Sequence, residues 1–226
     1  MKRRVLIIAP HADDEVLGCG GTIAKMTNEG HDIYVLIMTN AHVGAPEVCK
    51  AEWIEQVRKE ALDAHRMLGI TKTFFLNFPA PVLDQFPAYK MSIEILKYLE
   101  QFKIDTVFVP HRGDIHVDHK MVFNAALVSC RPVGDYSVKN IFAYETLSET
   151  ELAAPFGDDT FIPNYFISIK KEIFEIKCKA MNCFQSQLRK FPSSRSLGTL
   201  EALAKYRGST INRDRAEAFM VIRQIE

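Results

Sequence analysis

The sequence predicts an α/β fold: a Rossmann-like, doubly wound, mostly parallel sheet with helices on both of its faces. Short, continuously apolar runs alternate along the chain with amphipathic segments of helical period. Strands that alternate with helices form parallel sheets, whose crossovers are nearly always right-handed. The length of 226 residues and a hydrophobic content of 47% suit one globular domain.

The first strand is expected over Arg4–Pro10, because its run Val5–Ile8 is apolar and largely β-branched. Such a run is typical of a strand that is buried on both faces. Further strands are expected at Asp32–Thr39, Thr73–Leu76, Asp105–Val109, Ile141–Thr146 and Tyr165–Ile169, and a last apolar segment lies at Ala218–Ile222.

The first helix is expected over Gly18–Gly30, which ends at a glycine suited to a C-terminal cap. The helix Glu52–Leu68 carries one apolar stripe and is closed by Gly69. Its stripe consists of Trp53, Val57, Ala61, Ala64 and Leu68. The helix Tyr89–Phe102 has the core candidates Ile93, Ile95, Leu96 and Leu99. The other helices are expected at His119–Cys130, Lys170–Phe184 and Leu197–Tyr206.

Two loops, Pro79–Pro87 and Glu149–Pro163, are long enough to line a site. Lys and Arg balance Asp and Glu at 28 each, which argues against nucleic acid as a partner. The N-terminal apolar run is too short for a signal peptide, and no stretch approaches the length of a membrane span. Five cysteines without a C-x-x-C pair indicate reduced thiols in a cytoplasmic protein.

Two polar clusters follow predicted strands. His11, Asp13, Asp14 and Glu15 come directly after the first strand, and the segment 111–119 after the fourth strand holds three of the seven histidines. In a sheet of order 3-2-1-4-5 the first and fourth strands are neighbours. The crevice between their carboxyl ends is the switch point where ligands bind, so we expect the two clusters to face each other there.

The two clusters together predict a catalytic zinc site. Zinc takes imidazole and carboxylate ligands, and catalytic sites use three protein ligands and a water, whose pKa falls toward about 7. The remaining Asp and His side chains suit acid–base work. The alternative is that the acidic residues cap the first helix and that His116 and His119 are solvated loop residues. The joint placement of both clusters favours the metal.

The run His11-Ala12-Asp13-Asp14-Glu15 resembles the A-H-P-D-D-E signature of PIG-L/LmbE-like N-acetylglucosaminyl deacetylases, and the segment 116–119 resembles their H-x-D-H signature. Ser186-Gln187, Arg207-Gly208 and the segment 216–219 are similar to further family motifs. We therefore expect one deacetylase domain over residues 1–226, with a Rossmann-like core at 1–145 and a C-terminal part at 146–226 that completes the pocket.

The resemblance implies that His11, Asp14 and His119 bind one zinc per chain, with iron(II) or another divalent metal as the alternative. Asp13 would be the general base toward the zinc-bound water. His116 would be the protonated partner that stabilises the oxyanion and helps the amine leave, and Asp118 would orient His116. We interpret His111 and Asp114 as supporting residues rather than ligands, and expect surface or capping roles for His31, His42 and His65.

The implied function is zinc-dependent removal of an N-acetyl group from an N-acetylglucosamine-type sugar conjugate, by a cytoplasmic homo-oligomer. Expected substrate contacts are Arg58, Asp84 and Tyr144. Besides Ala12, which replaces the commoner proline, two positions depart from the family pattern: Ala80 follows Phe-Pro where Asp is common, and Asn40 replaces the Asp of T-D-G-E. Two alternatives therefore stay open, a metal-dependent amidohydrolase of a non-sugar N-acyl metabolite and a non-enzymatic metal- or sugar-binding module.

Overall fold

The computed structural model describes residues 2–133 and 137–226. Its centre is a seven-stranded sheet of order β3-β2-β1-β4-β5-β7-β6. The strands are β1 (Arg4–Ala9), β2 (Asp32–Asn40), β3 (Lys72–Pro79), β4 (Thr106–Pro110), β5 (Asn140–Tyr144), β6 (Tyr165–Ser168) and β7 (Ala216–Gln224). The first five strands are parallel, whereas β7 runs antiparallel to both β5 and β6. The predicted α/β fold and the order 3-2-1-4-5 are confirmed.

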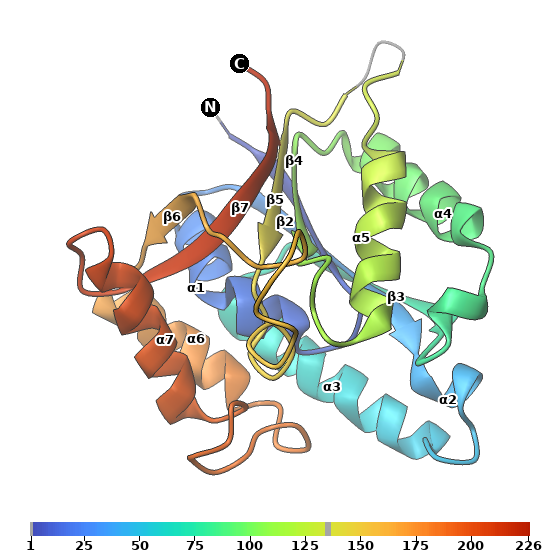
Figure 1. Cartoon of the computed structure of the whole chain (residues 1–226), viewed down its shortest axis with the longest axis horizontal. Helices are drawn as coiled ribbons and strands as arrows, with labels where there is room; N and C mark the ends of the chain where they lie inside the picture. The colour runs from blue at the N-terminus through green and yellow to red at the C-terminus, as the bar shows by residue number, and fades with distance from the viewer. Residues whose placement is uncertain (1, 134–136) are drawn as a thin grey trace.

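Helices cover both faces of the sheet (Figure 1). They are α1 (Asp14–Asn28), α2 (Ala41–Gly44), α3 (Ala51–Leu68), α4 (Ala88–Phe102), α5 (Val117–Ser129), α6 (Lys171–Met181) and α7 (Leu197–Ser209), with a 3₁₀ turn η1 at Leu83–Gln85. One core joins the sheet to α1, α3, α6 and α7, and the other joins it to α4 and α5. Successive residues of β1, such as Leu6 and Ile7, enter opposite cores, which explains the continuous apolar run.

Three details differ from the sequence prediction. Helix α1 begins at Asp14, four residues earlier than predicted, because carboxylates are favoured in a first helical turn. In α4 the buried apolar positions are Met91, Ile95 and Leu99, whereas Ile93 and Leu96 are exposed. Trp53 is also exposed although it begins the apolar stripe of α3, since this helix packs on the core mainly through its C-terminal half.

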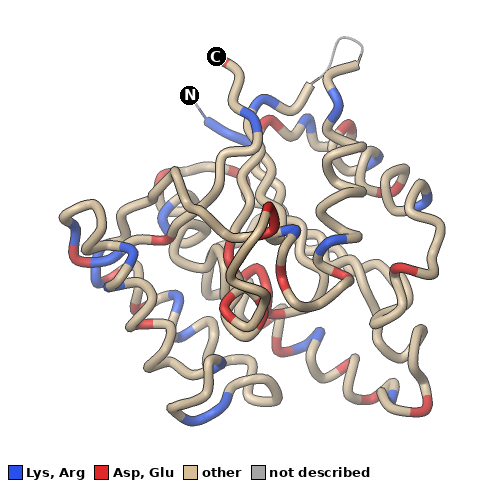
Figure 2. The backbone as a smooth tube through the Cα atoms, viewed as in Figure 1, with Lys and Arg blue, Asp and Glu red and all other residues tan. Residues whose placement is uncertain are grey.

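Charges of both signs are spread over the fold, and acidic segments lie together on loops at the centre of the view in Figure 2. All five cysteines are free thiols. Within the described ranges, no helix has both the length and the apolar character needed to cross a bilayer.

A buried ion pair fixes α1 against the C-terminal strand. Lys177 of α6 lies 2.5 Å from Glu217 Oε1 of β7, and both side chains are nearly inaccessible. The Glu217 carboxylate also accepts the backbone N–H groups of Gly21 and Thr22 at 2.8 and 2.6 Å. Because α1 carries the first polar cluster at its start, this contact ties the C-terminal part of the chain to the crevice.

We predict that Lys177→Met lowers the free energy of unfolding by about 3 kcal/mol, because it leaves the Glu217 carboxylate buried without its cation. Urea denaturation of the metal-free protein measures the change. Lys179→Met, on the exposed side of the same helix, is the matched control and should shift stability by less than about 0.5 kcal/mol. Equal effects of the two substitutions would contradict the prediction.

Candidate active site

The two polar clusters meet at the carboxyl ends of β1 and β4. The first is carried by the loop after Ala9 and the first turn of α1, and the second by the loop after Pro110 and the first turn of α5. The ring centroid of His11 lies 4.5 Å from that of His116 and 5.4 Å from that of His119. Residues separated by about a hundred positions therefore share one crevice.

His11, Asp14 and His119 converge on one point. His11 Nδ1 and His119 Nε2 each lie 3.3 Å from Asp14 Oδ2. Two ligand atoms that bind one tetrahedral zinc at about 2.0–2.1 Å lie about 3.3 Å apart, so the spacing suits such an ion. The three residues form a group whose ligand atoms all lie within 4.8 Å of one another.

The hydrogen bonding of these residues also fits a metal. Asp14 Oδ1 and His119 Nε2 are buried and have no hydrogen-bond partner among the described residues, which is costly unless a cation fills the gap. The outer nitrogens are held by carboxylates, His11 Nε2 by Asp118 at 3.3 Å and His119 Nδ1 by Asp114 at 2.7 Å. Metal-bound histidines are commonly held in this way.

A second group, formed by His11, His116 and Asp118, also has metal-ligand spacing. Its atoms are already engaged, however. His116 Nδ1 accepts the backbone N–H of Asp118, and the two Asp118 oxygens contact the Leu83 N–H and His11 Nε2. The unsatisfied atoms therefore favour His11, Asp14 and His119 as the metal-binding set.

The protonation states follow from these contacts. Burial disfavours the charged form of His11, but its hydrogen bonds to Asp118 and Asp14 outweigh burial and raise its pKa to about 9. For His119 burial is likewise outweighed by Asp14 and Asp114, and its pKa rises to about 10. Burial opposes ionisation of Asp14, yet the two histidines hold its pKa well below the usual range. Both imidazoles therefore carry a proton at neutral pH when no metal competes for them.

Asp13 has a strained backbone, with φ at 121° and ψ at −24°, a region that L-residues rarely adopt. Its N–H donates to Glu15 Oε2 at 3.1 Å, and Glu15 Oε1 lies 2.8 Å from His65 Nε2. His65 is in turn 2.8 Å from the hydroxyl of Thr73 on β3. The expectation of a surface or capping role for His65 is thus wrong, because a buried chain of contacts runs from β3 to Asp13.

Arg195, from the loop before α7, donates to Asp13 Oδ2 at 2.6 Å. Its Nε donates to Ser148 Oγ at 2.7 Å, which fixes the guanidinium. Burial raises the pKa of Asp13 to about 8, the Arg195 charge opposes the rise, and Asp14 and Glu15 add to it. Sequence reasoning missed Arg195, since it lies 182 residues from Asp13 and no local pattern marks it.

His116 caps α5, and its Nδ1 accepts the Asp118 N–H, so the neutral ring carries its proton on Nε2. Burial and the nearby charge of His11 lower its pKa to about 4. This neutral state differs from the protonated one that the family pattern implies. The Asp118 carboxylate lies closer to His11, at 3.3 Å, than to His116, at 3.9 Å.

These groups open into a cavity of about 410 Å³, a size typical of small-molecule sites. Its polar lining includes Asp13, His11, His116, Glu149, Gln187 and Arg195, and further lining residues come from β2, α2, α3 and the loop after β3. Arg58 of α3 also lines the cavity, and its Nη2 donates to Leu76 O and Asn77 Oδ1, both at 2.7 Å.

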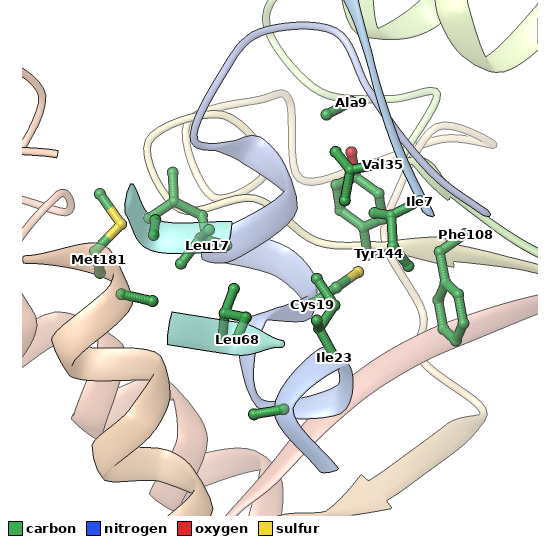
Figure 3. Close-up of a cluster of buried hydrophobic side chains, with 14 of the residues drawn as sticks. Ile7, Ala9, Leu17, Cys19, Ile23, Val35, Leu68, Phe108, Tyr144 and Met181 are labelled. Carbon is green, nitrogen blue, oxygen red and sulfur yellow. The ribbon is translucent and has the colours of Figure 1, made fainter. Parts of the chain in front are cut away.

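Two expected substrate contacts lie elsewhere. Tyr144 is fully buried, and its hydroxyl donates to Ile8 O at 2.9 Å. Figure 3 shows its ring beside Ile7 and Val35 in the core, so it cannot reach a ligand, and the prediction for Tyr144 is wrong. Asp84 is exposed on η1 and is not among the residues that line the cavity.

The supporting residues lie next to the ligand set. Asp114 holds His119 and itself accepts from Thr150 Oγ1 at 2.6 Å. His111 Nε2 donates to Asp159 O at 2.7 Å and so holds the loop between β5 and β6. Asn40 donates to Asn77 Oδ1 at 2.9 Å and caps α2, so its amide is engaged within the fold.

The sequence model of a family described as GlcNAc-PI de-N-acetylase (PIG-L) matches residues 6–130. The chain is 29% identical over 194 residues to the "uncharacterized deacetylase YaiS" of Escherichia coli (strain K12), a match that covers 82% of this chain and 92% of that protein. It is 28% identical over 192 residues to the diacetylchitobiose deacetylase of Thermococcus kodakarensis, covering 82% and 70%.

Among solved structures, the conserved protein TT1542 from Thermus thermophilus has a TM-score of 0.78 to this fold. The identity is 25%, and the match covers 98% of this chain and 96% of that one. The likeness therefore extends over both polar clusters and over the C-terminal part that carries Arg195.

We predict that Asp13→Gly is more stable than Asp13→Ala by about 1–2 kcal/mol in the metal-free protein. Both substitutions remove the carboxylate, but only glycine adopts the backbone conformation of residue 13 without strain. The relief of this strain exceeds the destabilisation that glycine causes through its greater conformational entropy in the unfolded chain. Thermal unfolding of the two variants under identical conditions gives the difference. An alanine variant as stable as the glycine variant would show that residue 13 is not strained.

Proposed function

Because the chain belongs to the GlcNAc-PI de-N-acetylase (PIG-L) family, we propose that it is a metal-dependent hydrolase that removes the acetyl group from an N-acetylglucosamine-type sugar conjugate. Its relatives include named deacetylases, which supports hydrolysis of an N-acetyl amide. We propose zinc as the metal, bound by His11, Asp14 and His119.

One observation carries this proposal. Asp14 and His119 keep buried, unsatisfied atoms, while the neighbouring residue Asp13 lines the same cavity as His11 and does not belong to the three-residue metal group. A site that only binds metal needs no such carboxylate, held in a strained backbone conformation. Strain of this kind is typical of functional sites.

When bound, the metal would lower the pKa of a coordinated water and polarise the amide carbonyl. The residues of the chain would supply the proton transfers. Asp13, in its ionised form, accepts a proton from the attacking water and then gives it to the amide nitrogen as the C–N bond breaks. The products are acetate and a primary amine.

His116 would act as a neutral hydrogen-bond donor. Its Nδ1 is occupied by the Asp118 N–H, so Nε2–H is the group left to face the developing charge on the carbonyl oxygen. Arg195 would hold the Asp13 carboxylate in place, since its guanidinium is itself fixed by Ser148. In this proposal the C-terminal part of the chain completes the pocket through Glu149, Gln187 and Arg195.

Arg58, which also lines the cavity, would contact the sugar or its substituent. A screen of metal-reconstituted protein against N-acetylglucosamine conjugates, read by fluorescent labelling of new amines, tests the proposed function. Acetate and amine should appear with at least one conjugate and vanish after chelation of the metal. A panel without product would contradict the proposal.

We predict that Asp13→Asn lowers kcat by at least about 100-fold, because the amide cannot accept the proton of the attacking water. The metal content should stay at the wild-type level, since the residue is not one of the proposed ligands. Amine release and mass-spectrometric metal analysis of the same sample check both statements. A fully metal-loaded variant that keeps more than a tenth of the wild-type activity would exclude Asp13 as the base.

We predict that metal binding at pH 7 releases close to two protons. The pKa values of His11 and His119, about 9 and 10 in the metal-free protein, keep both rings protonated at that pH, and an imidazole must be neutral to bind a metal. Metal affinity should therefore rise with pH between 6 and 8. Calorimetric titration in buffers of different ionisation enthalpy counts the protons, and release of fewer than one would contradict the proposed ligand set.

A further inference from the structure

The cavity has one wall that the proposed reaction does not use. This part of the lining, called the apolar wall, consists of Ala41, Cys49, Trp53, Ile54, Val57 and Pro81. These residues come from α2, α3 and the segments beside them, and α2 packs against α3 (Figure 1). Their side chains are almost entirely apolar.

The polar groups near this wall are largely engaged within the fold. The hydroxyl of Thr39, which also lines the cavity, donates to Pro10 O at 2.8 Å. Arg58 directs its Nη2 to Leu76 O and Asn77 Oδ1. A sugar hydroxyl that is buried without a partner costs about 1–3 kcal/mol, so this wall is poorly suited to a second, hydroxyl-rich ring.

Trp53 is the largest side chain of the wall, and 55% of it is exposed. Lys50 Nζ lies 5.8 Å from the centroid of the indole ring. The indole therefore contacts a cationic side chain and also lines the cavity. Exposed aromatic side chains that border a cavity commonly mark a ligand contact. The position of Trp53 at the cavity also explains why the first residue of the α3 stripe is not in the core.

We propose that the substrate carries an apolar alkyl or aryl group on its amino sugar, as the aglycone, and that this group lies against Trp53. The proposal rests on the proposed function. Because relatives are named deacetylases, the acyl group is the two-carbon acetyl, and a longer apolar group must come from the aglycone. The apolar wall would then determine which substrate binds, whereas the residues around the proposed metal site would carry out the reaction.

Trp53 is the single tryptophan of the chain, so its fluorescence reports on this wall alone. Zinc-loaded protein is titrated with methyl, butyl and hexyl glucosaminides, the deacetylated products, which bind without being hydrolysed. Affinity should rise at least tenfold from methyl to hexyl, with a blue shift of the emission, because each buried methylene strengthens binding by up to about fourfold. An emission that does not change, or equal affinities across the series, would overturn the proposal.

Hydrolysis of the matching N-acetyl glycosides gives a second readout. The ratio of kcat/KM for hexyl over methyl should exceed ten in the wild type and fall toward one in Trp53→Ala. Leu62→Ala, an exposed position of the same helix outside the cavity lining, is the control and should keep the wild-type ratio. The proposal would also be overturned if kcat/KM rose with the length of the N-acyl group in methyl glycosides but did not rise with the length of the aglycone.

The failure of the proposed function is distinguishable from the failure of this inference. If no glycoside releases acetate, the deacetylase assignment fails, and the fluorescence titration still decides whether the wall binds alkyl chains. If acetate is released but neither affinity nor kcat/KM depends on aglycone length, the deacetylase assignment stands and the apolar wall has no role in substrate choice.

Discussion

The site depends on the burial of several carboxylates in one crevice. Asp13, Asp14, Asp114 and Asp118 are nearly inaccessible to solvent, yet they lie close together at the ends of β1 and β4. Buried charges are tolerated only when they are paired or bind a metal. His11 and His119 supply part of the counter-charge, Arg195 supplies another part, and the unsatisfied atoms of the cluster indicate where a divalent cation would supply the rest.

Other features of the fold follow from this requirement. The chain enters α1 through a strained Asp13, and the strain is held by Glu15 and His65 on one side and by Arg195 on the other. The Lys177–Glu217 pair joins α1 to the C-terminal strand, so the segment that delivers Arg195 is tied to the helix that begins at the cluster. Interactions far from the crevice therefore keep Asp13 in position.

Much of this arrangement could be predicted from the sequence. Apolar runs that alternate with amphipathic segments predict the order of the first five strands, and that order places His11 and His119 in one crevice. Arg195, His65 and Trp53 could not be assigned in this way. Their roles arise from tertiary contacts across long sequence separations, which no local period encodes. Tyr144 was misplaced for a related reason, since a strand end gives no sign of which face its last side chain occupies.

We propose that His11, Asp14 and His119 form the metal site. Anomalous diffraction at the zinc absorption edge, from crystals grown with one equivalent of zinc, tests this assignment. One zinc peak should appear, bonded to His11 Nδ1, Asp14 and His119 Nε2, with Asp13 and His116 left unbound to metal. A peak among His11, His116 and Asp118, or no peak in the crevice, would contradict it.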